Sequence, residues 1–252
     1  MGVELTRIVH RLDEFLRHAE ITDWSGALNG LQVQNSGSVS RVAAAVDASA
    51  RTIEVATRLG CDLLLVHHGL FWDGNVAVTG RRYRRLRAAL SADLAIYASH
   101  LPLDVHEGVG NNAVLARELG IQLAGRFGVE KGTEVGVWGR IDVKREVLAA
   151  RLDDVLGCRI HMMPFGPEIV RTVGVITGGA GSMIGAAVAA GLDAFITGEG
   201  AHHTHFDAEE GGINVFYGGH YATETWGVRA LAAWMEAEFG LPWEFIDHPT
   251  GL

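Results

Sequence analysis

The sequence predicts an α/β protein with two similar strand-helix-strand halves, and three observations support this class. A pattern recurs within the chain, each copy alternates apolar strands with a helical segment, and 48% of the 252 residues are hydrophobic. This hydrophobic content excludes a largely disordered chain. A chain of this length buries roughly 70–75% of its unfolded surface on folding. We expect mainly parallel sheets flanked by helices.

The first element is predicted to be an amphipathic helix that begins at residue 5. Its apolar residues follow helical spacing. They are Leu5, Ile8, Val9, Leu12, Phe15 and Leu16. Acidic residues interrupt this segment, so we expect no signal peptide. No run of 18 apolar residues occurs in the sequence, so we also expect no membrane-spanning segment.

An internal repeat organises the rest of the chain. Residues 42–69 align without gaps with residues 173–200, at a constant offset of 131. The identical pairs are Val42/Val173, Ile53/Ile184, Ala56/Ala187, Gly60/Gly191, Asp62/Asp193 and Gly69/Gly200. Each copy reads as a strand, a turn, a helix, a Gly-x-Asp step and a second strand, which predicts parallel strands. We favour a duplication with pseudo-twofold symmetry over convergence of two generic units.

The resemblance between the copies continues at an offset of 120. IYASHLPLD, residues 96–104, aligns with FYGGHYATE, residues 216–224. His100 and His220 occupy matching positions, as do Asp104 and Glu224. Each copy therefore carries a histidine followed four residues later by a carboxylate.

These patterns divide the chain into a first α/β half, 1–121, a connecting segment, 122–170, and a second half, 171–252. Within the connecting segment, residues 128–143 alternate like extended chain and residues 145–157 have helical period, which predicts a short subdomain. Residues 223–240 are expected to form a long C-terminal helix that packs on the sheet.

Charge and cysteine usage limit the function classes. The net charge is −9, which disfavours the basic surface that duplex nucleic acid requires. Cys61 and Cys158 are 97 residues apart and match neither a disulfide framework nor a zinc ribbon, so we expect a cytoplasmic location. Only two lysines occur, and neither lies in a P-loop motif.

Polar residues follow several of the predicted strands. They are His67, His68, His100, Glu199 and His220. Ligands in parallel α/β units gather at the carboxyl ends of strands, so we expect these side chains to project toward one edge of one sheet. Neighbouring residues in a strand point to opposite faces, so His67 and His68 would serve two ions, one each.

Mixed imidazoles and carboxylates favour Zn, Fe, Mn, Co or Ni over Mg or Ca. Asp104 and Glu224 are the natural bridging groups if two ions lie ~3.5–4 Å apart. The sequence therefore predicts a transition-metal site.

Three motifs, HHGLFW, SHLPLDVHEGVGNNAVLA and GEGAHHTHFDAEEGGINVFYGGHYATETWG, resemble in order those of the dinuclear metal-binding family labelled GTP cyclohydrolase I type 2-like, or Nif-three-like. The resemblance runs from NGLQV at residues 29–33 to the C-terminal helix. It implies two divalent ions per chain and a toroidal homohexamer. The ligands that it implies are His67, His68, Asp104, His220 and Glu224.

Further candidates remain open at this point. Glu199 and His203 are favoured as groups that orient ligands or transfer a proton, against the alternative of solvated loop residues. The sequence does not determine whether His100, His202 and His205 are functional. The segment Arg81–Arg87 holds five arginines that could grip phosphate, but a solvated helix face is the favoured interpretation. The GGAGS turn, 178–182, is a weak candidate for anion binding.

Two functional hypotheses follow. In the first, a metal-activated water attacks a purine-type ring or a phosphate ester of a small-molecule substrate, and Glu199 or one of His202 and His203 moves the proton. In the second, the ions organise a non-catalytic protein that assembles or binds partners.

Overall fold

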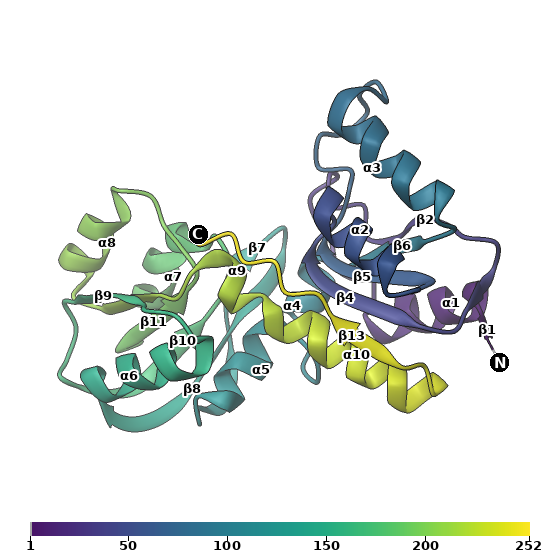
Figure 1. The fold of residues 1–252 in the computed structure, drawn as a ribbon. Coiled ribbons are helices and arrows are strands. Elements are labelled where there is room, and N and C mark those ends of the chain that lie inside the picture. Colours follow the sequence, from purple (N-terminus) through teal and green to yellow (C-terminus); the bar gives the residue numbers. More distant parts are fainter. Residues whose placement is uncertain (1) are drawn as a thin grey trace. The chain divides into compact units, whose positions relative to one another are not determined.

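The computed structural model describes residues 2–252 (Figure 1). The chain divides into two compact units. The first comprises residues up to Leu103 together with Gly227–His248, and the second comprises Asp104–Trp226 with Pro249–Leu252. Each unit has a sheet flanked by helices, so the predicted α/β class is confirmed.

The first unit is built on a five-stranded sheet in the order β13-β4-β5-β6-β2. The pairings from β13 to β6 are parallel, and β2 closes one edge antiparallel. The strands of this unit are β1 (Val3–Glu4), β2 (Gly30–Val33), β3 (Ser38–Val39), β4 (Val42–Asp47), β5 (Leu63–His68), β6 (Ala95–Ala98) and β13 (Trp243–Phe245). Its helices are α1 (Leu5–Phe15), α2 (Ala50–Arg58), α3 (Gly80–Ser91) and most of α10 (Thr225–Phe239).

Specific side-chain contacts determine where helix α2 begins and how helix α1 packs in the first unit. The helix predicted from residue 5 is confirmed as α1, and Phe15 stacks on Trp234 of α10 with ring centroids 3.9 Å apart. Helix α2 begins after Ser49 because two reciprocal hydrogen bonds form a capping box there. The Ser49 hydroxyl accepts from the backbone N–H of Thr52, and the Thr52 hydroxyl accepts from the backbone N–H of Ser49. Its buried Ile53 then joins the apolar core.

The second unit is built on a six-stranded sheet in the order β7-β8-β10-β11-β12-β9. Its three strands β10, β11 and β12 are parallel, and antiparallel strands flank them. The strands are β7 (Gln122–Glu130), β8 (Thr133–Lys144), β9 (His161–Pro164), β10 (Ile169–Val175), β11 (Ala194–Thr197) and β12 (Asn214–Tyr217). The helices are α5 (Asn111–Glu118), α6 (Arg145–Leu156), the 3-10 turn η1 (Gly181–Met183), α7 (Ile184–Ala189), α8 (Thr204–Gly211) and α9 (His220–Thr223). The short helix α4 (Leu101–Asp104) spans the division, and only Asp104 of it belongs to this unit.

The extended segment and the helix predicted at residues 128–143 and 145–157 are confirmed as the β7-β8 hairpin and α6. These elements belong to the second unit, where β8 pairs with β10 and α6 contributes Leu148 and Leu152 to the core. The division into 1–121, 122–170 and 171–252 stays a prediction.

The two copies of the repeat form the same local structure. Gly60 and Gly191 both have a φ of +68°, a conformation that favours glycine after a helix. Asp62 accepts from the backbone N–H groups of Ser40 and Arg41 at 2.6 and 3.1 Å. Asp193 accepts from the residues at the same offset, Arg171 and Thr172, at 2.8 and 2.9 Å. In each copy the aspartate therefore holds the backbone just before the residues that begin the parallel pairing, Val42 and Val173.

The expectation that the polar strand ends share one edge of one sheet is wrong. Strands β5 and β6 belong to the five-stranded sheet, and β11 and β12 belong to the six-stranded sheet. The reason is that each copy completes its sheet with its own flanking strands, which satisfy the backbone hydrogen bonds of the parallel core. His67, His68 and His100 therefore follow strands of one sheet, and Glu199 and His220 follow strands of the other.

Among residues 2–252, none of the helices combines the length and the apolar content that a bilayer crossing demands.

Candidate functional site

Three histidines of the first unit lie together at the carboxyl ends of β5 and β6. His67 and His68 are the last residues of β5, and His100 follows β6. The ring centroid of His67 lies 4.7 Å from that of His68 and 5.0 Å from that of His100. One ring nitrogen from each residue lies within 4.8 Å of the others. This group, which we call the three-histidine set, could hold a metal ion.

Each ring of the three-histidine set has an oxygen acceptor beside its Nδ1 atom. The pairs are His67 with the Ser99 carbonyl at 2.9 Å, His68 with Asp47 Oδ1 at 3.0 Å and His100 with Asp23 Oδ1 at 3.0 Å. An acceptor at Nδ1 places the ring proton there, so Nε2 carries the lone pair. Metal-binding histidines are oriented in this way in proteins generally.

Asp23 is a buried carboxylate that contacts His100. Its side chain is 5% exposed, and it accepts from Asn29 Nδ2 at 2.8 Å and from the backbone N–H groups of Trp24 and Leu101. Burial alone would raise the pKa of Asp23, but hydrogen bonds from His100, Asn29 and Trp24 and the charge of His100 lower it to about 2. A fixed negative charge therefore faces His100.

The sequence did not identify Asp23 or Asp47. Asp47 is the last residue of β4 and pairs in register with His68, so the strand-end pattern that marked the histidines could have identified it. Asp23 lies in the irregular segment between α1 and β2, where no periodicity or spacing indicates a role.

In the second unit, one imidazole lies between two carboxylates. His220 begins α9, with its Nδ1 2.7 Å from Glu199 Oε1 and its Nε2 3.2 Å from Glu224 Oε2. The Glu224 side chain is 4% exposed, whereas that of Glu199 is 48% exposed. The hydrogen bond to Glu224, the charge of Glu224 and the contact with Glu199 raise the pKa of His220 to about 9 despite its partial burial. A bound metal ion or a proton on His220 offsets the negative charge of the two carboxylates.

Glycine makes the space for Glu224. Gly178 has a φ of +72°, and a Cβ atom built on it would clash with Glu224 Oε1. The turn after β10 must therefore be glycine at this position, both for its backbone conformation and for the close approach of the carboxylate. This explains part of the GGAGS turn that the sequence marked.

Asp104, the remaining proposed ligand, ends α4 and is buried. Its Oδ1 accepts from Asn111 Nδ2 at 2.9 Å. Asn111 is the first residue of α5 and is itself buried, so the helix start holds the carboxylate in place. The sequence did not mark Asn111 as a functional residue.

A pocket of about 360 Å³ adjoins Glu199 in the second unit. It is lined by Gly179, Gly181, Ser182, Glu199, Gly200, Ala201, His203 and Thr204. The two candidates for proton transfer, Glu199 and His203, therefore face one cavity. His202 packs edge-on against Phe206, and His205 packs edge-on against Phe165, and neither is part of the lining.

The arginine-rich segment Arg81–Arg87 lies on α3, of which only Ala89 is buried in the described helix. Arg81 forms an ion pair with Asp73 at 2.8 Å, which lowers the pKa of Asp73. Arg82 donates to the carbonyl of Gly74 and lies over the ring of Phe71. These contacts are those of a largely solvated helix face.

Comparison with known proteins places these residues in a family. The profile of Duf34/NIF3 (NGG1p interacting factor 3) matches residues 3–250. A Deinococcus radiodurans protein called GTP cyclohydrolase 1 type 2 homolog is 45% identical over 249 residues, which cover 97% of this chain and 93% of that protein.

Two solved structures are also similar. A protein called ybgI, described as of unknown function, superposes with a TM-score of 0.92 at 37% identity, covering 99% of this chain and 100% of its own. A Thermus thermophilus protein superposes with a TM-score of 0.91 at 40% identity and the same coverage. The family match over nearly the whole length, together with these relatives, shows that the chain belongs to the Duf34/NIF3 family.

Proposed function

We propose that this protein binds two divalent transition-metal ions and uses them to hydrolyse a nucleotide or a related heterocycle or phosphate ester. The observation that carries the proposal is the three-histidine set, in which an acceptor at each Nδ1 leaves Nε2 to present its lone pair. The pair His220 and Glu224 supplies the mixed nitrogen and oxygen donors that such metals accept.

The proposed ligands are His67, His68, Asp104, His220 and Glu224, as the resemblance of the HHG, HLPLD and GHYATE motifs implies. We add His100, because its ring nitrogen groups with those of His67 and His68. The donor chemistry within each unit supports this assignment. Divalent ions bound by such ligands supply a water of lowered pKa as the nucleophile.

The residues of the pocket beside Glu199 have roles in this proposal. Glu199 and His203 line it together, and both are side chains of the kind that acts in general acid–base catalysis. The glycines in its wall allow a substrate to approach the backbone closely. We propose that this pocket receives the substrate and that Glu199 or His203 transfers the proton. Relatives named GTP cyclohydrolase 1 type 2 homolog make GTP the first compound to test.

The test combines metal analysis with a hydrolysis screen. The purified protein is loaded with Mn, Zn, Co or Fe, its metal content is measured, and GTP, other nucleotides, phosphodiesters and cyclic amides are offered. We expect about two ions per chain and a turnover that chelator abolishes and metal restores. Two bound ions with no turnover of the whole panel would favour a non-catalytic, metal-dependent assembly protein. Less than half an ion per chain would contradict both versions.

Exchange of Asp23 for asparagine tests how the three-histidine set is oriented. Asp23→Asn keeps the size of the side chain but removes the charge facing His100, so metal affinity is expected to fall about 10–100-fold. Competition with a chromogenic chelator measures this affinity without any assay of activity. Asp73→Asn, which removes an exposed carboxylate of the same unit, is the matched control. Equal affinities of the two variants would show that Asp23 does not position a ligand.

The assembly implied by the family resemblance gives another expected result. We propose a homohexameric ring, so the native mass should be near six times 27.0 kDa. Light scattering after size-exclusion chromatography measures this mass. A monomer at micromolar concentration would refute the ring.

A further inference from the structure

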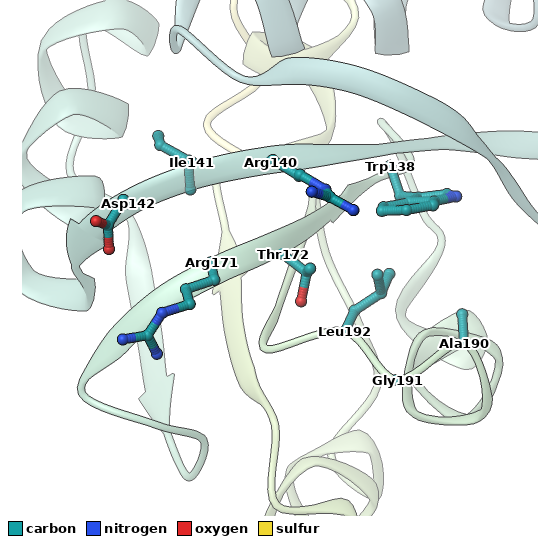
Figure 2. A pocket seen from close by; sticks show the side chains of 9 residues that line it. All are labelled: Trp138, Arg140, Ile141, Asp142, Arg171, Thr172, Ala190, Gly191 and Leu192. Atoms are coloured by element: carbon teal, nitrogen blue, oxygen red, sulfur yellow. The ribbon is translucent and has the colours of Figure 1, made fainter.

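A pocket of about 490 Å³ lies in the second unit, and Figure 2 shows the side chains that line it. Its lining includes Trp138, Arg140, Asp142, Arg171, Gly191 and Leu192. Gly191 and Leu192 precede β11, whereas Glu199 follows it. This pocket therefore opens at the amino end of the parallel strands, and the pocket beside Glu199 opens at their carboxyl end.

One end of this pocket is bounded by an aromatic ring and apolar side chains. Figure 2 shows the Trp138 indole nearly edge-on, with the side chains of Leu192 and Ala190 across from it. The indole lies against Gly125 on the neighbouring strand, where an added Cβ atom would come within 2.6 Å of Nε1. The ring is therefore supported from the strand side. An aromatic ring inserted between Trp138 and Leu192 would stack on the indole and bury apolar surface.

The rest of the lining carries positive charge. The Arg140 guanidinium lies beside Trp138, and the Arg171 guanidinium lies toward the opposite end of the pocket (Figure 2). Within residues 2–252, neither guanidinium forms an ion pair or a hydrogen bond. By contrast, Arg126 and Arg145 of the same unit donate to backbone carbonyl groups. Two guanidinium groups along one cavity suit an extended anion, since guanidinium binds phosphate oxygens in pairs.

The opposing charge in the lining is that of Asp142, which lies toward the Arg171 end (Figure 2). Two guanidinium groups against one carboxylate disfavour a metal cation in this pocket. They also disfavour a wholly apolar ligand, because it would cover the charged groups without pairing them. The ligand should therefore combine a planar ring with phosphate groups.

We propose that this pocket binds a nucleotide, with its base between Trp138 and Leu192 and its phosphates paired with Arg140 and Arg171. The pocket volume falls in the range usual for small-molecule sites, about 300–1,000 Å³. The site uses none of the proposed metal ligands and none of the residues that line the pocket beside Glu199. It therefore stands whether or not the protein hydrolyses a substrate.

The experiment measures binding of ATP, adenosine and tripolyphosphate to the full chain by isothermal titration calorimetry, with chelator present throughout. Chelator removes metal-dependent binding and turnover from the measurement. ATP is expected to bind at least tenfold more tightly than adenosine or tripolyphosphate, since only ATP fills both ends of the pocket. Absence of ATP binding at millimolar concentration would overturn the proposal, as would tripolyphosphate binding that equals ATP binding.

Variants locate the site. Arg140→Gln and Arg171→Gln should each weaken ATP binding about tenfold, because each removes a charged donor to phosphate. The matched control is Arg159→Gln, which removes an exposed arginine of the same unit outside the pocket lining and should leave binding unchanged. Asp142→Asn should strengthen ATP binding, since it removes the opposing charge. Equal effects of Arg140→Gln and Arg159→Gln would show that ATP binds elsewhere.

Trp138 needs two variants, because its ring also packs on Gly125. Trp138→Leu should weaken ATP binding and leave tripolyphosphate binding unchanged, and Trp138→Phe should restore part of the ATP affinity. Thermal unfolding of each variant checks that the fold is intact. A Trp138→Phe variant that folds normally and binds ATP as weakly as adenosine would contradict stacking at this position.

Discussion

Replacing Glu224 by alanine is expected to remove most of the bound metal. Glu224 is buried, and its Oε2 lies 3.2 Å from His220 Nε2, so alanine deletes a proposed bridging ligand and leaves the imidazole without this carboxylate. The loss of metal affinity should exceed the roughly 10–100-fold that is typical when a group that hydrogen-bonds to a metal ligand is removed. Elemental analysis after dialysis should show a fall from about two ions per chain to less than one.

His203→Ala is the control for this prediction. His203 is exposed and lines the pocket beside Glu199, where we propose that it transfers a proton rather than binds metal. This variant should keep its metal. Equal metal loss in Glu224→Ala and His203→Ala, or a larger loss in His203→Ala, would show that the ligands have been assigned wrongly.

The free energy of unfolding of the metal-free protein is expected to fall as pH rises from about 6.5 to about 9. The pKa of His220 is raised from 6.5 to about 9, mainly by the hydrogen bond to Glu224. A raised pKa means that the folded protein holds the proton more tightly than the unfolded chain does. The resulting stability is complete below pH 6.5 and is lost as pH rises through about 9. Because His220 is partly exposed, we expect a loss on the order of 2 kcal/mol.

Urea denaturation in chelator at pH values from 6 to 9.5 measures this effect. His220→Gln should flatten the pH dependence over this range, because glutamine does not titrate. His10→Gln is the control, since His10 is an exposed histidine whose neighbour is likewise a glutamate four residues along the chain. A wild-type stability that does not change between pH 6.5 and 9 would contradict the raised pKa of His220.

The same proton links stability to metal binding. A metal ion requires neutral imidazole, so binding at pH 7–8 must displace the proton that His220 shares with Glu224 and Glu199. Metal affinity should therefore rise with pH up to about 9. Calorimetry in buffers of different ionisation enthalpy counts the protons released.

Local signals in the sequence predicted much of the fold. The pairs Gly60/Gly191 and Asp62/Asp193 were visible as identities in the sequence. In the structure both glycines form a left-handed turn, and both aspartates accept hydrogen bonds from the backbone at the first parallel strand of the unit. Such features are readable because the backbone conformation and the short-range hydrogen bonds depend on residues close in the chain. The spacing of His220 and Glu224 was readable for the same reason, since four residues span one helical turn.

Other features depend on contacts between distant segments. Asp23 in an irregular segment contacts His100 across 77 residues of chain. Asp47 contacts His68 across 21 residues, because β4 pairs with β5. The end of the pocket at Trp138 depends on Gly125 of the neighbouring strand β7 and on Leu192, which precedes β11. No periodicity marks Asp23, Gly125 or Leu192, because each is selected by shape and charge in the folded protein.

The sequence by itself determined the α/β class, the repeated strand-helix-strand order and the histidines and carboxylates that follow the strands, since hydrophobic period and turn residues act locally. Only the tertiary structure decided that the two copies build separate sheets, that Asp23 and Asp47 face His100 and His68, and that His220 is the imidazole that Glu199 contacts. The physical reason is that strand order and side-chain pairing follow from long-range packing, which brings together residues whose separation in the chain carries no pattern.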